Sequence, residues 1–138
     1  NIPVRSIAIH ENNTFAGTDV GMFLSTDTGD NWIEKNKGLI KTQVYSITID
    51  ENNMWVGTEH GIFLSTDKGS SWKNKLITSD TVVYCVQNYG SKIFAGTQGR
   101  GLLISSDNGD SWSKSVLTDN YIQCIAVNEN NKADNNVN

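Results

Sequence analysis

Hydrophobic and polar positions alternate along this chain in short runs, and polar clusters separate the runs. The run Arg5–Ile9 has an apolar side chain at every second position, which is typical of a half-buried β-strand. The Glu-Asn-Asn cluster at 11–13 then predicts a turn. Apolar runs at 14–18 and 22–25 predict two further strands, and a fourth begins at Trp32. Since no stretch shows a helical period, the pattern predicts an all-β protein.

The same pattern returns along the chain, each time with the motif Ser-x-Asp-x-Gly-x-x-Trp. The motif serines are Ser25, Ser65 and Ser105, so the period is 40 residues. The similarity extends over the whole period, because "VRSIAIHENN" near the start returns as "VYSITIDENN" in the second copy. The repeats are expected at about residues 4–43, 44–82 and 83–121, with the first strand of a fourth repeat at 122–131 and a polar tail at 132–138.

Four short strands in a repeat of about 40 residues are typical of one blade of a β-propeller. A sheet of this size buries both of its faces only when other sheets stack on them. Closed propellers have about 4 to 8 blades. The expected fold is therefore part of a propeller, with two explanations open. The chain is a fragment of a longer propeller, or two copies combine into one ring.

The repeated motif favours a structural role over a ligand site. An Asp carboxylate accepts hydrogen bonds from the backbone N–H groups that follow it, and Gly permits a positive φ in the same turn. Burying one Trp removes about 150–250 Å² from water, so we expect the Trp to fill the gap between blades. The motif residues are Ser25, Asp27, Gly29, Trp32, Ser65, Asp67, Gly69, Trp72, Ser105, Asp107, Gly109 and Trp112.

This motif resembles the Asp-box, or BNR repeat, of sialidase-, xyloglucanase- and sortilin-type propellers and of photosystem II assembly-factor-like proteins. The longer phrase "GIFLSTD", with "VGT" before it, resembles repeats of bacterial secreted or surface proteins. The resemblance implies a propeller fold and an extracellular, cell-surface or periplasmic location.

The turns between the second and third strands of each repeat are the candidate binding sites. Strands alternate in direction, so these turns lie at the end of the blades opposite the repeated motif. The repeats differ there, and the third copy has one residue more. Such variation is compatible with binding specificity, and it also arises in loops that nothing constrains. The candidate binding residues are Asp19, Glu59, His60, Gln98 and Arg100.

No complete catalytic set is present. Sialidase chemistry would require three arginines, and the chain has only Arg5 and Arg100. Asp19 and Glu59 occupy equivalent turns and would suit the paired carboxylates of a glycosidase, but both are also ordinary turn residues. We therefore expect a non-catalytic scaffold that binds a glycan or a protein. The alternative is a fragment of a sialidase- or xyloglucanase-like glycoside hydrolase whose catalytic residues lie in other blades.

Composition and residue spacing argue against further classes of partner and site. The net charge of −4 argues against nucleic acid, and no apolar run approaches the roughly 20 residues of a membrane span. His10 and His60 lack the spacing of metal ligands, so no metal or cofactor is expected. Cys85 and Cys124 occupy a position that holds Ser in the other repeats, and we expect both to be free, buried thiols.

Overall fold

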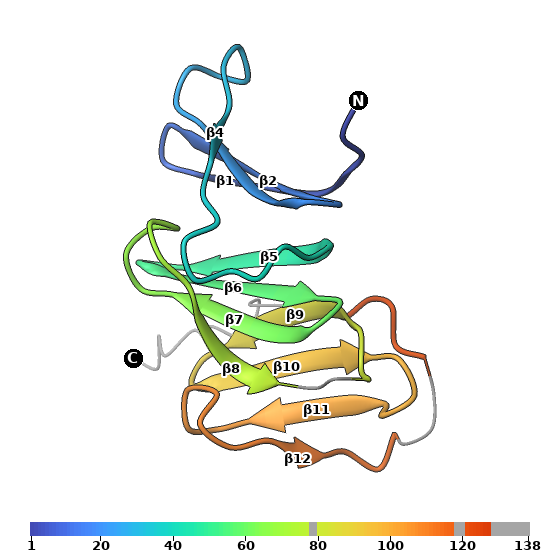
Figure 1. Cartoon of the computed structure of the whole chain (residues 1–138). Coiled ribbons are helices and arrows are strands. Elements are labelled where there is room, and N and C mark those ends of the chain that lie inside the picture. The colour runs from blue at the N-terminus through green and yellow to red at the C-terminus, as the bar shows by residue number, and fades with distance from the viewer. Residues whose placement is uncertain (78–79, 118–120, 128–138) are drawn as a thin grey trace, which may run out of the picture.

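A computed structural model describes residues 1–77, 80–117 and 121–127 of the chain, and its regular structure in this part is β-strand. The strands form three antiparallel sheets of four, each from consecutive strands (Figure 1). This confirms the predicted all-β fold of four-stranded repeats. The strands are β1 (Val4–His10), β2 (Asn13–Thr18), β3 (Gly21–Ser25) and β4 (Ile33–Glu34) in blade 1, β5 (Val44–Asp50), β6 (Asn53–Thr58), β7 (Gly61–Ser65) and β8 (Lys73–Ile77) in blade 2, and β9 (Val83–Tyr89), β10 (Lys92–Thr97), β11 (Leu102–Ser105) and β12 (Ser113–Lys114) in blade 3.

The three blades stack on one another, and their first strands β1, β5 and β9 are neighbours (Figure 1). We call the side of each blade that carries the motif Trp its front face, and the opposite side its back face. In blade 2 the front face contains Ile47, Val56, Phe63 and Trp72, and in blade 1 it contains the equivalent Ile7, Ala16, Phe23 and Trp32.

The core consists of two layers between the blades. In the first layer, Phe15 and Met22 on the back face of blade 1 pack against Phe63 and Trp72 on the front face of blade 2. The second layer repeats this arrangement between blades 2 and 3. It contains Trp55, Ile62, Leu64, Val83, Val86, Ile93, Ala95 and Leu103.

A glycine in the second strand of each blade permits the close approach of the next blade. A Cβ added to Gly57 would lie 2.8 Å from the carbonyl oxygen of Val83, the first residue of β9. Gly17 meets Val44 in the same way. The backbones therefore approach more closely than any larger residue would allow.

The turns lie at two opposite ends of the blades (Figure 1). The loops that hold the repeated motif, at 25–32, 65–72 and 105–112, lie at one end and are called the box loops. The turns β2–β3, β6–β7 and β10–β11 lie at the other end, which we call the turn face. The antiparallel order thus separates the box loops from the candidate binding residues, as predicted.

Some sequence expectations differ from the structure. Residues 121–127 form no strand, although Ile122 N–H donates to Thr97 O at 3.1 Å and Ile122 contacts Gly96 as Val44 contacts Gly17. The expected remainder of this repeat and the tail, at 128–138, lie outside the described residues. The strands β4 and β12 contain two residues each and begin just after the motif Trp.

The prediction of two buried thiols is wrong for one of them. Cys85 of β9 is buried, and burial raises the pKa of its thiol to about 11. Cys124 is exposed, because no second strand of a fourth blade covers it within the described residues.

Candidate functional site

Each box loop is closed by hydrogen bonds among its own residues. In blade 2, the Ser65 hydroxyl donates to Asp67 Oδ1 at 2.8 Å and accepts from Gly69 N–H at 2.8 Å. The same Asp67 oxygen accepts from Ser71 N–H at 2.8 Å. Lys68 and Gly69 both have positive φ values, of 55° and 80°. These bonds use the carboxylate to hold the loop.

The hydrogen bonds also lower the pKa of the motif carboxylates. The pKa values of Asp27, Asp67 and Asp107 are each lowered to about 2. The main cause is the side-chain hydrogen bond from Asn31, Ser71 or Ser111, followed by the backbone N–H of the same residue. All three carboxylates are therefore ionised acceptors at neutral pH, and none has the raised pKa of a general acid.

The motif Trp residues lie in different environments, although their loops are equivalent. Trp72 is 4% exposed, and its Nε1–H donates to Lys35 O of blade 1 at 2.8 Å. Trp112 likewise reaches Lys75 O of blade 2 at 3.3 Å. Trp32 is 41% exposed and donates to Gly29 O of its own loop. The expectation that the Trp lies between two blades is therefore wrong for Trp32 in the described part of the chain.

At the turn face, the candidate residues are held beside the first strands of the blades. The backbone N–H of Asp19 donates to Pro3 O at 3.2 Å, and Glu59 N–H donates to Gln43 O at 3.1 Å. Gln98 N–H makes the equivalent bond to Val82 O at 2.9 Å. These bonds join each turn to the segment that enters the first strand of its own blade.

The side chains of the candidate residues differ in their contacts. Asp19 forms an ion pair with Arg5, and His60 Nδ1 lies 2.9 Å from the Thr42 hydroxyl. Gln98 accepts a hydrogen bond from Tyr84. Glu59 and Arg100 are exposed. The structure thus distributes the five residues over three adjacent turns.

A β-bulge at the start of the first strand of each blade brings three further residues to the turn face. In β1, Val4 pairs with Thr18 and Ser6 pairs with Gly17, so Arg5 has no partner in the ladder. Tyr45 and Tyr84 are unpaired in the same way in β5 and β9. Bulges bend a strand and redirect a side chain, and they are frequent near functional sites. We call Arg5, Tyr45 and Tyr84 the bulge row.

The bulge row is continuous across the three blades. The Arg5 guanidinium lies over the Tyr45 ring, 5.1 Å from its centroid, and the rings of Tyr45 and Tyr84 meet edge to face at 5.3 Å. Burial raises the pKa of the Tyr45 hydroxyl, which donates to Gln43. Tyr84 donates to Gln98 at 3.2 Å. The three side chains are therefore held by contacts with one another and with the neighbouring turns.

Sequence reasoning missed the bulge row, although a signal was present. The residue before the row is Val in all three repeats, and the residue after it is Ser or Cys. The row position itself changes from Arg5 to Tyr45 and Tyr84. This variable position lies between a constant Val and a small residue. It went unnoticed because strand alternation alone does not reveal a bulge.

Comparison with known proteins places the chain in a family. A family model described as the DUF6242 beta propeller domain matches residues 7–131. The chain belongs to the DUF6242 beta-propeller family. Comparison with curated protein sequences gave no match.

Solved structures share the fold of this DUF6242 segment at low sequence identity. YCF48 bound to D1 peptide has a TM-score of 0.68 and 15% identity, over 82% of this chain and 40% of that one. An ancestral GH74 enzyme has a TM-score of 0.67 and 18% identity, over 80% and 18%. The GH74 xyloglucanase from Xanthomonas campestris has a TM-score of 0.65 and 13% identity, over 82% and 22%. The DUF6242 segment thus spans less than half the length of each of these proteins.

The described part of the DUF6242 segment offers neither a metal site nor a membrane-spanning helix. Residues 1–77, 80–117 and 121–127 contain no group of three or more His, Cys, Asp or Glu side chains placed to hold a metal ion. No helix among them is long and apolar enough to cross a membrane. The bulge row and its surrounding turns receive residues from all three blades.

Proposed function

We propose that this DUF6242 segment is a non-catalytic scaffold that binds a protein segment at the turn face. The bulge row forms the centre of the binding surface. The candidate residues of the neighbouring turns, Asp19, Glu59, His60, Gln98 and Arg100, form its rim.

The observation that carries this proposal is the shared bulge. An extra residue that leaves the ladder in all three blades brings Arg5, Tyr45 and Tyr84 together, although they are far apart in sequence. Tyr and Arg are among the residues most enriched at protein interfaces and their hot spots. Their mutual packing reduces the side-chain entropy that a partner would otherwise have to remove.

The chemistry of the row favours a protein over a glycan. Arg5 covers the Tyr45 ring, and Tyr84 meets the same ring at an interplanar angle of 79°. The Tyr45 ring is therefore already engaged and is not a free platform for a sugar ring. The remaining groups are a guanidinium, hydroxyls and side-chain amides, which suit the carbonyl and amide groups of a polypeptide. YCF48, which has a similar fold, is known in complex with a peptide.

The glycoside hydrolase alternative has weaker support. Asp19 forms an ion pair with Arg5, so its carboxylate is already bound within its own blade. The resemblance to secreted bacterial repeats remains the reason to propose an extracellular or surface location.

Selection from a displayed peptide library against the whole chain tests the proposal. We expect Tyr84→Ala to lower the affinity for the selected peptides at least about tenfold, as truncation of a hot-spot residue does. Tyr89→Ala is the matched control, since Tyr89 is 44% exposed at the other end of the same strand. Peptide affinities should be unchanged in that variant.

Three results would contradict the proposal. Selected peptides that bind both Tyr variants equally would remove the bulge row from the binding surface. Glycans that bind in place of peptides would change the ligand class. Hydrolysis of fluorogenic glycosides, abolished by Glu59→Ala, would establish the enzyme alternative.

A further inference from the structure

The connection from β4 to β5 leaves its sheet earlier than the equivalent connection in blade 2. β4 contains two residues, whereas β8 contains five. In blade 2, Leu76 of β8 pairs with Ile62 of β7. Asn36 occupies the position of Leu76 in blade 1, and its side-chain Oδ1 accepts from the Met22 N–H at 2.7 Å. Because a side chain takes the place of the main chain here, the connection can turn away from the sheet.

The connection is held by both of the blades that it joins. Leu39 N–H donates to Asn36 O at 3.0 Å and closes a turn. Lys37 O accepts from Trp72 N–H of blade 2 at 2.9 Å. The Leu39 side chain is 6% exposed and belongs to the core layer between blades 1 and 2. The course of the connection is therefore fixed.

A pocket of about 370 Å³ lies between this connection and the β2–β3 turn. Its volume is at the lower end of the range of about 300–1,000 Å³ for small-molecule sites. All of its lining residues lie on blade 1 or on the connection to blade 2. We call it the connection pocket, and it is lined by Val20, Glu34, Asn36, Leu39 and Lys41.

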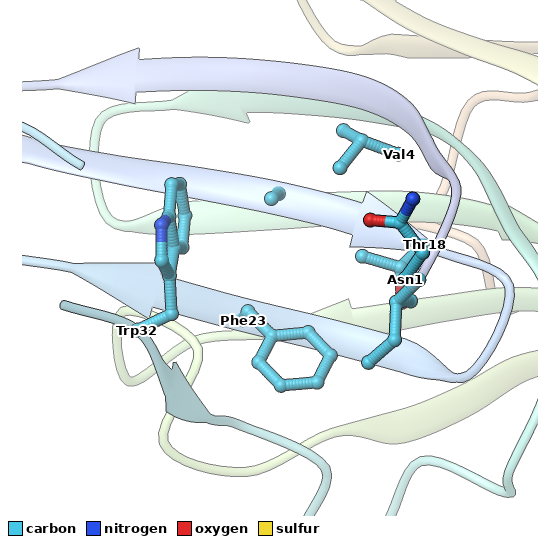
Figure 2. A pocket seen from close by; sticks show the side chains of 7 residues that line it. Asn1, Val4, Thr18, Phe23 and Trp32 are labelled. Atoms are coloured by element: carbon cyan, nitrogen blue, oxygen red, sulfur yellow. The ribbon is translucent and has the colours of Figure 1, made fainter. Parts of the chain in front are cut away.

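Charged side chains distinguish the connection pocket from a second pocket, of about 400 Å³, on the front face of blade 1. Figure 2 shows the second pocket, with Trp32 at one end, Val4 at the other and Phe23 between them. No Asp, Glu, Lys or Arg side chain lines it. The connection pocket has one charge of each sign over an apolar floor.

The two charges of the connection pocket do not neutralise each other. Glu34 and Lys41 are exposed, and the ion pairs of the described residues involve other side chains. The bond from Met22 N–H to Oδ1 fixes the orientation of the Asn36 amide, so its Nδ2 remains as a further donor. A ligand that carries both an ammonium and a carboxylate can satisfy all three groups.

We infer that the connection pocket binds a free aliphatic α-amino acid as its zwitterion. The ligand ammonium donates to the Glu34 carboxylate, and the ligand carboxylate accepts from the Lys41 ammonium and from Asn36 Nδ2. The aliphatic side chain lies against Val20 and Leu39. A residue within a polypeptide carries neither charge on its main chain, so this ligand differs from the peptide proposed for the bulge row.

Titration of the isotope-labelled whole chain with L-leucine, followed by heteronuclear NMR, tests the inference. We expect saturable shifts of the backbone amides of Val20 and Leu39 and of the side-chain amide of Asn36, in the millimolar range of L-leucine. The backbone amide of Tyr84 should not shift. Tyr84→Ala should leave leucine binding unchanged, so a failure of this inference can be told from a failure of the peptide proposal.

Three analogues test the ligand groups one at a time. N-acetyl-L-leucine lacks the ammonium and L-leucinamide lacks the carboxylate. Each should bind about fivefold more weakly than L-leucine, which is the upper end for an exposed ion pair. Glycine keeps both charges and should bind several-fold more weakly, because it has no side chain to place on the apolar floor.

Charge-neutral variants test the protein groups. Glu34→Gln and Lys41→Gln should each lower the affinity for L-leucine about fivefold, and both side chains are exposed, so the core is unchanged. Lys37→Gln is the matched control, since Lys37 is an exposed cation of the same connection outside the pocket lining. In Glu34→Gln, acetylation of the ligand should have no further effect, because the partner of the ammonium is already absent.

Three outcomes would overturn the inference. L-leucine would leave the amides around the connection pocket unshifted. The two analogues that lack a charge would bind as tightly as L-leucine, so that the pocket does not recognise a zwitterion. Lys37→Gln would lower the affinity as much as Lys41→Gln, so that the net charge of the chain and not the pocket is responsible.

Discussion

The front faces of blades 1 and 2 have similar residues and different surroundings. Phe23 and Phe63 occupy the same position, as do Trp32 and Trp72, yet only the blade 2 residues are buried. The box loops below them have the same internal hydrogen bonds. The comparison shows that each box loop is formed by residues of its own blade. The contribution of the loop's Trp to stability depends on whether a neighbouring blade covers it.

Replacing Trp32 or Trp72 should give the largest difference in stability between the two front faces. We expect Trp72→Ala to lower the free energy of unfolding by about 3–5 kcal/mol, as in other buried aromatic truncations. Trp32→Ala should cost less than about 1 kcal/mol, since its ring is partly in water. Urea unfolding of both variants measures the difference. Equal losses would show that the front face of blade 1 is covered in solution.

Replacing a box-loop glycine by alanine should give a smaller difference in stability between an open loop and a covered one. Gly29 and Gly109 both have positive φ, so each variant carries a backbone cost of about 1–2 kcal/mol. Gly109→Ala also brings a Cβ within 2.9 Å of Trp55, and overpacking adds about 1–3 kcal/mol. Gly29→Ala lacks this second cost. Thermal unfolding of the pair should therefore rank Gly109→Ala as the less stable, and the reverse order would contradict the packing.

Replacing a motif carboxylate should have the same effect on stability in blade 1 as in blade 2. The pKa values of Asp27 and Asp67 are lowered to about 2 from an unfolded value of about 3.9. Their contribution to stability is therefore present above about pH 4 and is lost as pH falls toward 2. Asp27→Asn and Asp67→Asn should each lower the melting temperature by a few degrees at pH 7 and weaken the decline in acid.

Melting curves between pH 2 and pH 7 compare these variants with the parent chain. If the pH profiles of the two variants match, each box loop is held by its own hydrogen bonds. A much larger effect of Asp67→Asn would mean that the neighbouring blade also holds the loop.

The sequence was sufficient to predict the strands of the three complete repeats, the period and the separation of the box loops from the variable turns. These features depend on alternation and turn chemistry within one repeat. The exposure of Trp32 was not predictable in the same way, because it depends on a neighbour and not on the residues around it. The bulge row was missed for a related reason. An unpaired residue appears only when the register of two strands is known.

The bulge has a consequence for how this surface can change. Arg5, Tyr45 and Tyr84 have no partner opposite them in the ladder, and the flanking Val and Ser or Cys positions maintain the strand pairing. Substitutions in the row therefore leave the backbone pairing of the strands in place, and what they remove is contacts among the side chains of the row. Together with the adjacent turns, the row provides a natural set of positions for randomised libraries, in which affinity for new ligands is selected while the blades keep their strand pairing.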